Sequence, residues 1–210
     1  MSAAQTDPML ELRHAARVLD RAGFLPASDG NLSARGDDGR VFITRSDVEK
    51  RALTEDGFVV LSLDSERSPG ASSEWPMHRA LYRARPDVRS VLHVHSPFLT
   101  AFACAHRIPS VNLLAESCAS VGPIVLVDYR PPGSEELAQA LLTASMTAGV
   151  YLLANHGAVA VGAKVREALH RLERAEFLAH VEWLAAALGG GLPLSADVIH
   201  ELQRGRGDRC

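Results

Sequence analysis

The segment VLHVHSP, residues 91–97, places two histidines two positions apart in an apolar run that ends before a proline. In a β-strand successive side chains point to opposite faces, so His93 and His95 share one face and Leu92 and Val94 share the other. The pattern predicts a strand with one core face and one face that carries chemistry. The two histidines are either half-buried strand residues satisfied by hydrogen bonds or ligands of a metal ion.

A third histidine stands in LLANHGAVAVG, residues 152–162, between two apolar runs. The glycine after His156 favours a turn at which the backbone approaches another group closely. Three neutral imidazoles are the ligand set of a catalytic zinc ion, which keeps a further position open for water or substrate. His93, His95 and His156 are therefore candidates to hold one Zn²⁺ ion, or another divalent metal, per chain.

A carboxylate precedes the histidine strand. The segment SSEWPMH, residues 72–78, puts Glu74 at the start of a predicted helix, where it could bind the metal or transfer protons. The alternative is an ordinary first-turn glutamate stabilised by the helix dipole. The other histidines considered lie on helical patterns and are expected to be surface or packing residues: His78, His106, His170, His180 and His200.

Two polar loops could bind an anion. The first is SDGNLSAR, residues 28–35, which offers backbone N–H groups and the amide of Asn31. The second is ITRSDVEK, residues 43–50. Its candidate groups are Thr44, Arg45 and Ser46. Backbone N–H groups, hydroxyls and a guanidinium suit a phosphate or a carboxylate, although each loop taken separately is also just a turn.

The composition limits the class of protein. A chain of 210 residues with 47% hydrophobic residues can bury one sizeable core. A formal charge of -3 gives no basic field for nucleic acid or an anionic membrane, so the expected partners are small-molecule substrates. No apolar run approaches the ~20 residues of a membrane span and the N-terminus lacks a secretory pattern, so we expect a cytoplasmic protein.

The spacing of apolar residues predicts one mixed α/β domain over residues 1–188. Helical patterns alternate with short strand-like runs, and the hairpin-like connections favour an antiparallel sheet flanked by helices. Three glycines at 189–191 begin a tail, residues 189–210, which we expect to be mobile or recruited to a neighbour's surface.

Six motifs occur in a fixed order: GNxSxR, TxS, SSE before a helix, HVHSP, PPGSEELA and NHGAVAVG. Together they resemble the class II aldolase/adducin-head family, typified by the zinc-dependent L-fuculose-1-phosphate aldolases, from about residue 8 to residue 188. The resemblance implies a three-layer α/β/α domain around a mainly antiparallel sheet, usually in a homotetramer with active sites between subunits. It also implies zinc on the three histidines and proton transfer by Glu74. The implied phosphate site comprises the loop 44–47 with Asn31, Ser46, Ser72 and Ser73.

Two departures from the family pattern bear on the substrate. The aldolases usually carry T-P-S/T-G where this chain has Thr44, Arg45, Ser46 and Asp47, so an acid replaces the glycine near the phosphate. Near Leu113 the fuculose-phosphate enzymes place a tyrosine that helps to deliver a proton, whereas this chain reads SVNLLAES. Either Tyr129 or Glu116 replaces that tyrosine, or the reaction differs.

The predicted site favours a zinc-dependent lyase of the class II aldolase type. Zinc with three neutral ligands keeps its full charge and can stabilise an enediolate, which makes retro-aldol cleavage of a small sugar phosphate feasible. A decarboxylase or dehydratase could use the same zinc site, and Arg45 would then pair with a substrate carboxylate. A non-catalytic, adducin-like binding module is the alternative from another class, but adducin-type heads lack the metal histidines that this chain retains.

Overall fold

The computed structural model describes residues 7–66 and 68–207. Its described strands form one seven-stranded sheet in the order β3-β2-β1-β4-β7-β6-β5. Every neighbouring pair is antiparallel except β5 and β6, which are parallel. The strands are β1 (Asn31–Arg35), β2 (Val41–Thr44), β3 (Phe58–Leu61), β4 (Ser90–Val94), β5 (Ile124–Val127), β6 (Val150–Leu153) and β7 (Gly157–Gly162). The predicted mainly antiparallel sheet is confirmed.

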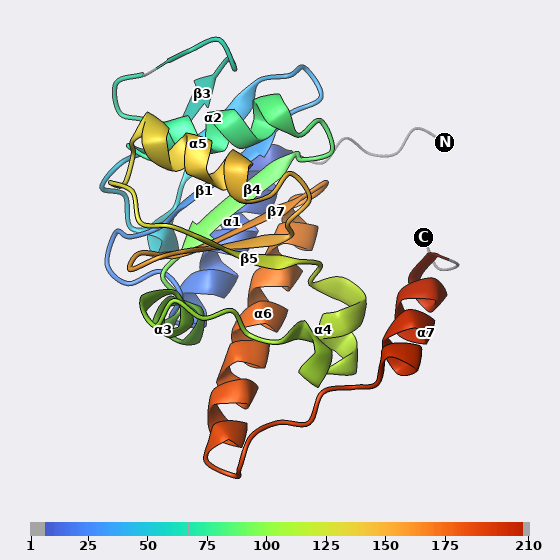
Figure 1. Cartoon of the computed structure of the whole chain (residues 1–210). Helices are drawn as coiled ribbons and strands as arrows, with labels where there is room; N and C mark the ends of the chain where they lie inside the picture. The colour runs from blue at the N-terminus through green and yellow to red at the C-terminus, as the bar shows by residue number, and fades with distance from the viewer. Residues whose placement is uncertain (1–6, 67, 208–210) are drawn as a thin grey trace.

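Helices cover both faces of the sheet, which gives the expected three layers (Figure 1). Helices α2 (Trp75–Ala84) and α5 (Glu135–Ala144) pack together on one face. The opposite face is covered by α1 (Pro8–Arg21), α3 (Pro97–Cys104) and α6 (Val165–Ala186). The shorter elements are α4 (Ala115–Ser120) and the 3₁₀ turns η1 (Lys50–Ala52), η2 (Glu55–Gly57) and η3 (Val111–Leu113).

Strand β4 lies at the centre of the sheet, between β1 and β7, and all five of its residues are buried. Leu92 and Val94 belong to the hydrophobic cluster on the side of α1 and α6. Val91 belongs to the cluster on the side of α2 and α5, and the two-residue alternation places His93 on that side too. The predicted division of this strand into a core face and a chemical face is therefore seen, although both faces are covered by helices.

Local signals fix where the helices begin. Asp7 caps α1 by accepting a hydrogen bond from the Met9 N–H, and Pro8 occupies the first helical position. Ser134 caps α5 by accepting from the Leu137 N–H. Glu74 occupies the equivalent position before α2 without a capping side-chain bond. Its carboxylate is therefore not committed to its own helix.

The end of the described chain forms a further helix, α7 (Ala196–Gly207), which contacts α4. The Leu194 N–H donates to the carbonyl oxygen of Asn112, which ties the preceding segment to η3. The mobility of residues 189–210 stays a prediction, but the chain before and within α7 has defined contacts. Among the described residues, no helix is both long enough and apolar enough to cross a bilayer.

Candidate metal centre

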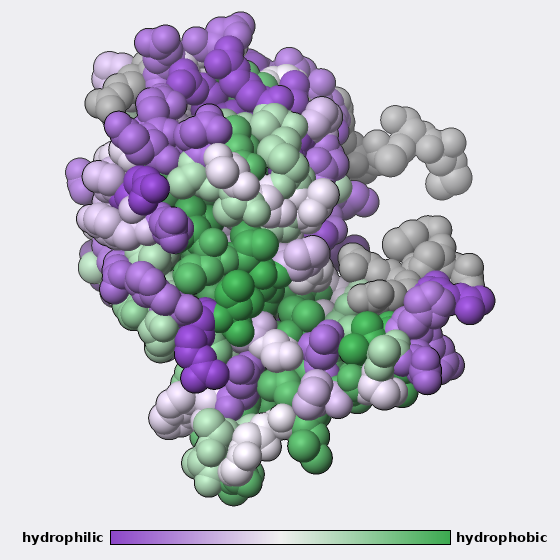
Figure 2. Space-filling model, viewed as in Figure 1, coloured by the Kyte–Doolittle hydropathy of each residue, from purple (hydrophilic) through white to green (hydrophobic). Residues whose placement is uncertain are grey.

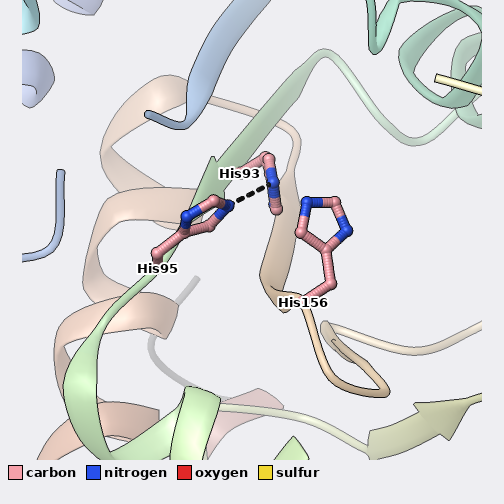
Figure 3. Close-up of side chains that lie close together, drawn as sticks. All are labelled: His93, His95 and His156. Carbon is pink, nitrogen blue, oxygen red and sulfur yellow. Dashed lines mark hydrogen bonds between the residues drawn. The ribbon is translucent and has the colours of Figure 1, made fainter. Parts of the chain in front are cut away.

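The three candidate metal ligands come from two neighbouring strands. His93 lies in β4, His95 follows it directly, and His156 precedes β7, which pairs with β4 through Val94 and Ala158. The three ring centroids lie 4.7–5.2 Å apart. Each ring offers one nitrogen to a cluster whose atoms all lie within 4.8 Å of one another, and Figure 3 shows the rings converging on one space.

For His93 and His95, a hydrogen bond at Nδ1 leaves Nε2 as the nitrogen that faces the cluster. His93 donates from Nδ1 to the carbonyl oxygen of Ala158 at 3.0 Å, and His95 Nδ1 lies 3.2 Å from Oδ2 of Asp29. The Nε2 atoms of His93 and His95 therefore face each other, and they lie 3.1 Å apart. Nitrogens bound to one tetrahedral zinc ion at ~2.0–2.1 Å have a similar spacing, so these residues fit a divalent metal.

The electrostatic setting keeps the rings in the form that metals bind. Burial, together with the neighbouring histidines, lowers the pKa of His93 well below its usual value. Burial, helped by His95 and opposed by Asp29, lowers the pKa of His156 to about 4. Both rings are therefore neutral at pH 7, as metal ligation requires. Nδ1 of His156 is buried and has no hydrogen-bond partner among the described residues.

Gly157 allows the histidines to meet. A Cβ atom at this position would lie 2.5 Å from the carbonyl oxygen of Val94 and 2.7 Å from Cδ2 of His95. Any larger residue would push the His95 ring or the β4 backbone away. The close approach predicted from the N-H-G turn is therefore confirmed, and the group approached is the second histidine itself.

Glu74 is a buried carboxylate with an altered acidity. It is 5% exposed, and burial raises its pKa to about 7, while the backbone N–H of Gly133 acts in the opposite direction. Its Oε2 atom is buried and unpaired among the described residues. A carboxyl group whose pKa lies near 7 can hold or release a proton with equal ease, which is what general acid–base catalysis requires.

A buried chain of hydrogen bonds leads from α2 to Asn31 in β1, the strand beside β4. The Tyr82 hydroxyl contacts Ser33 Oγ at 2.7 Å, which contacts Nδ1 of His78 at 2.6 Å. Nε2 of His78 lies 2.5 Å from Oδ1 of Asn31, and Asn31 is the cross-strand partner of His93. Burial lowers the pKa of His78 to about 3, so the ring is neutral and donates from Nε2. Because His78 uses only the Oδ1 atom of Asn31, the NH₂ group of Asn31 can donate a hydrogen bond to another group.

Glu74 and His78 are four residues apart at the start of α2, so their side chains share one helix face. Because His78 contacts Asn31, this face of α2 is the one directed toward β1 and β4. The sequence predicted His78 to be a surface or packing residue. It is fully buried, and its position links Asn31 to the helix that carries Glu74.

The loop 44–47 and the segment 70–73, which carry most of the predicted phosphate-binding residues, lie side by side. The Ser72 N–H donates to the carbonyl oxygen of Thr44, and the Ser46 N–H donates to that of Gly70. The Thr44 side chain is fully buried, with Oγ1 accepting from the Leu32 N–H, so it supports the fold of β1. Arg45 is exposed, and its Nε donates to the carbonyl oxygen of Asp56.

The serines before Glu74 differ in exposure. Ser72 is buried and its Oγ accepts from the Glu74 N–H at 3.3 Å, whereas Ser73 is exposed. Gly133 lies against this turn, because a Cβ atom there would be 2.7 Å from the carbonyl oxygen of Ser73. The PPGS segment thus packs on the turn that presents Glu74.

Asp47, at the position where the motif resemblance implies a glycine, adopts a left-handed backbone conformation with φ of 59°. Aspartate tolerates this region better than most residues, which explains how it can take the place of a glycine. Lys50, only 2% exposed, attracts both Asp47 and Asp29. Lys50 therefore offsets the negative charge that Asp47 introduces beside the predicted anion site.

Tyr129 and Glu116, the two residues predicted to replace a tyrosine near Leu113, are both exposed. Tyr129 is 53% exposed, and Glu116 is an exposed residue in the first turn of α4. Among the described residues, no hydrogen bond or ion pair joins either side chain to the three histidines. Their role as a replacement proton donor stays a prediction.

Comparisons with known proteins agree with this fold and this histidine cluster. A 5-methylthioribulose-1-phosphate/5-deoxyribulose-1-phosphate aldolase of Rhodospirillum rubrum is 33% identical over 200 residues, covering 92% of this chain and 90% of the relative. A 3-oxo-tetronate 4-phosphate decarboxylase of Haemophilus influenzae is 30% identical over 179 residues, covering 82% and 84%. A solved L-fuculose 1-phosphate aldolase superposes with a TM-score of 0.81 at 25% identity, covering 96% of this chain and 97% of that one.

A seven-stranded, mainly antiparallel sheet between two helical layers, with three histidines at the ends of its central strands, defines an α/β/α domain with a candidate metal centre. The family model described as "Class II Aldolase and Adducin N-terminal domain" matches residues 10–183. The chain belongs to this family, and the resemblance read from its motifs is confirmed.

Proposed function

We propose that the protein is a zinc-dependent lyase that cleaves a carbon–carbon bond of a small sugar phosphate. The observation that carries this proposal is the convergence of three imidazoles, with the Nε2 atoms of His93 and His95 facing each other at 3.1 Å. Aldolases of sugar phosphates among the relatives support the substrate class.

The histidines would hold the metal, which when bound would polarise a substrate oxygen and stabilise negative charge developing on it. The chain's own residues supply the remaining chemistry. Glu74, with its pKa near 7, would hold a proton in the buried site and deliver it to the substrate carbon. The NH₂ group of Asn31, oriented by His78, would donate to a substrate oxygen.

A decarboxylase is the second candidate, because the Haemophilus influenzae relative carries that activity. Arg45 is less suited to a substrate carboxylate than the sequence indicated, since its Nε is used by the Asp56 carbonyl oxygen. Its exposed guanidinium nitrogens would have to serve instead. The adducin-like binding module is disfavoured because the chain retains Glu74 and all three histidines, and the histidines lie together.

The test is to incubate the zinc-loaded protein with ketose 1-phosphates and with 3-oxo acid phosphates, while measuring aldehyde and CO₂ separately. We expect aldehyde release from a ketose phosphate that is abolished by a chelator and restored by added metal. CO₂ release without aldehyde would identify the decarboxylase. Absence of both products, with the metal bound, would contradict both carbon–carbon cleavage and decarboxylation of these substrates.

We also propose that the chain forms a homo-oligomer, most simply a tetramer. A groove of about 540 Å³ is lined largely by apolar groups, among them Phe98, Phe102, Leu113 and Trp183. Leu188 and Leu192 in the adjoining segment are 88% and 91% exposed, and Figure 2 shows apolar side chains gathered on one face of the molecule. Exposed apolar area of this kind is typical of subunit interfaces.

Light scattering at micromolar concentration should therefore return a mass of several chains. The mass of one chain is 22.6 kDa. A measured mass near that value would contradict the oligomer, and Trp183→Ser should shift the protein toward it. His170→Ser on the same helix serves as the control.

A further inference from the structure

The connection between α1 and β1, residues 22–30, runs along the end of the histidine strand from Phe24 onward. The carbonyl oxygen of Phe24 accepts from the His95 N–H at 3.0 Å. At the other end of this loop, a Cβ atom on Gly30 would lie 2.6 Å from the carbonyl oxygen of His93. The loop therefore packs directly against the backbone of both strand ligands.

Asp29 brings the carboxylate of this loop to the side of His95 that faces away from the cluster. Its Oδ2 lies 3.2 Å from Nδ1 of His95, while Nε2 of the same ring faces His93. Asp29 therefore contacts the ring nitrogen that the metal would not use. A carboxylate in this position holds a ligand ring in one orientation and one tautomer, and it raises the basicity of the nitrogen that binds metal.

The Asp29 side chain is half exposed, so the loop needs another anchor. Lys50, in η1, provides it by donating from Nζ to the carbonyl oxygen of Ser28, the residue before Asp29. Lys50 is almost fully buried and is attracted by Asp29 and Asp47. Burying a lysine costs free energy unless the ammonium group is paired. The burial of Lys50 beneath this loop therefore indicates that Lys50 anchors the loop.

We propose that Asp29 is a positioning residue for His95, and that Lys50 holds the loop which carries it. The proposal rests on the metal centre of the proposed function, but it concerns this chain's own residues around that centre. Asp29 fixes the ring of His95 before the metal arrives, so the cluster is preorganised. Lys50 acts through Asp29, because its side chain bonds the loop at Ser28 and makes no hydrogen bond to the three histidines among the described residues.

The first test is Asp29→Asn, which keeps the shape of the side chain and removes its charge. Zinc affinity is measured by competition with a chromophoric chelator, and the ligand geometry by the visible absorption of the Co²⁺-substituted protein. We expect affinity to fall by about 10- to 100-fold and the Co²⁺ spectrum to change. The unfolding midpoint of the metal-free protein should stay unchanged. If Asp29 had a purely structural role, the variant would keep its zinc affinity and its Co²⁺ spectrum, and the unfolding midpoint of the metal-free protein would fall.

Asp64→Asn is the matched control, because it removes an exposed carboxylate that pairs with Arg83 on the surface. This variant should bind zinc as the wild type does. Lys50→Met should weaken zinc binding in the same direction as Asp29→Asn. The loss of zinc-binding free energy in the double variant should be smaller than the sum of the losses in the two single variants, since both changes act on one loop.

Wild-type zinc affinity and an unchanged Co²⁺ spectrum in Asp29→Asn would overturn the proposal, even if Lys50→Met failed to fold. Fully additive losses in the double variant would overturn the role given to Lys50. A wild-type protein that binds no metal would refute the proposed function as well, so the two failures can be told apart.

Discussion

Replacing Glu74 with glutamine should lower turnover by about 10²–10⁴-fold, the usual contribution of a general acid or base. The amide has nearly the same shape, but it cannot hold and release a proton near pH 7 as the buried carboxyl does. Steady-state kinetics on the substrate found in the product assay measure the effect. Metal content, measured on the same preparation, should equal that of the wild type.

The control for this variant is Glu135→Gln, which changes an exposed first-turn glutamate of α5. Its turnover should match that of the wild type. If Glu74→Gln lost its metal, Glu74 would be mainly a ligand and the proton carrier would lie elsewhere. If it kept both metal and full turnover, Glu74 would have no part in the reaction.

The same substitution should stabilise the metal-free protein at alkaline pH. The pKa of Glu74 is raised from 4.5 to about 7 in the folded chain, so the native state holds the proton more tightly than the unfolded state. This proton binding adds stability below pH 4.5 that is lost as the pH rises through 7. The difference of about 2.5 pKa units corresponds to about 3 kcal/mol.

At pH 8 the wild type must therefore bury an ionised carboxylate with an unpaired oxygen, whereas Glu74→Gln buries a neutral amide. Chemical denaturation of metal-free protein should show the variant more stable by about 3 kcal/mol at pH 8, with a difference near zero at pH 4.5. Comparing the two proteins at each pH cancels the contributions of the histidines. A pH-independent difference would contradict the raised pKa of Glu74.

The ligand set could be predicted from sequence because its signals are local. The two-residue alternation of VLHVH put His93 and His95 on one face, and the glycine after His156 marked a close approach that the structure assigns to Val94 and His95. The signal for a helix start at Glu74 is also local, because a proline stands two residues later.

The surrounding groups could not be predicted because they arise from contacts between distant segments. Asp29 reaches His95 across 66 positions and His78 reaches Asn31 across 47, and no spacing rule links such pairs. Thr44 was predicted from sequence to bind substrate, but strand pairing buries its hydroxyl, which accepts a hydrogen bond from the Leu32 N–H. The parallel pairing of β5 with β6 likewise depends on how α5 crosses the sheet.

The metal content of the purified protein tests the central claim most directly. Elemental analysis by mass spectrometry, after exposure to zinc and removal of excess ion, should find about one divalent metal per chain in the wild type. The occupancy in His95→Ala should be lower by tenfold or more, because the loss of one ligand also disturbs the orientation of the other two. A wild type without bound metal, or a His95→Ala variant with unchanged zinc, would contradict the assignment of His93, His95 and His156 as a metal site.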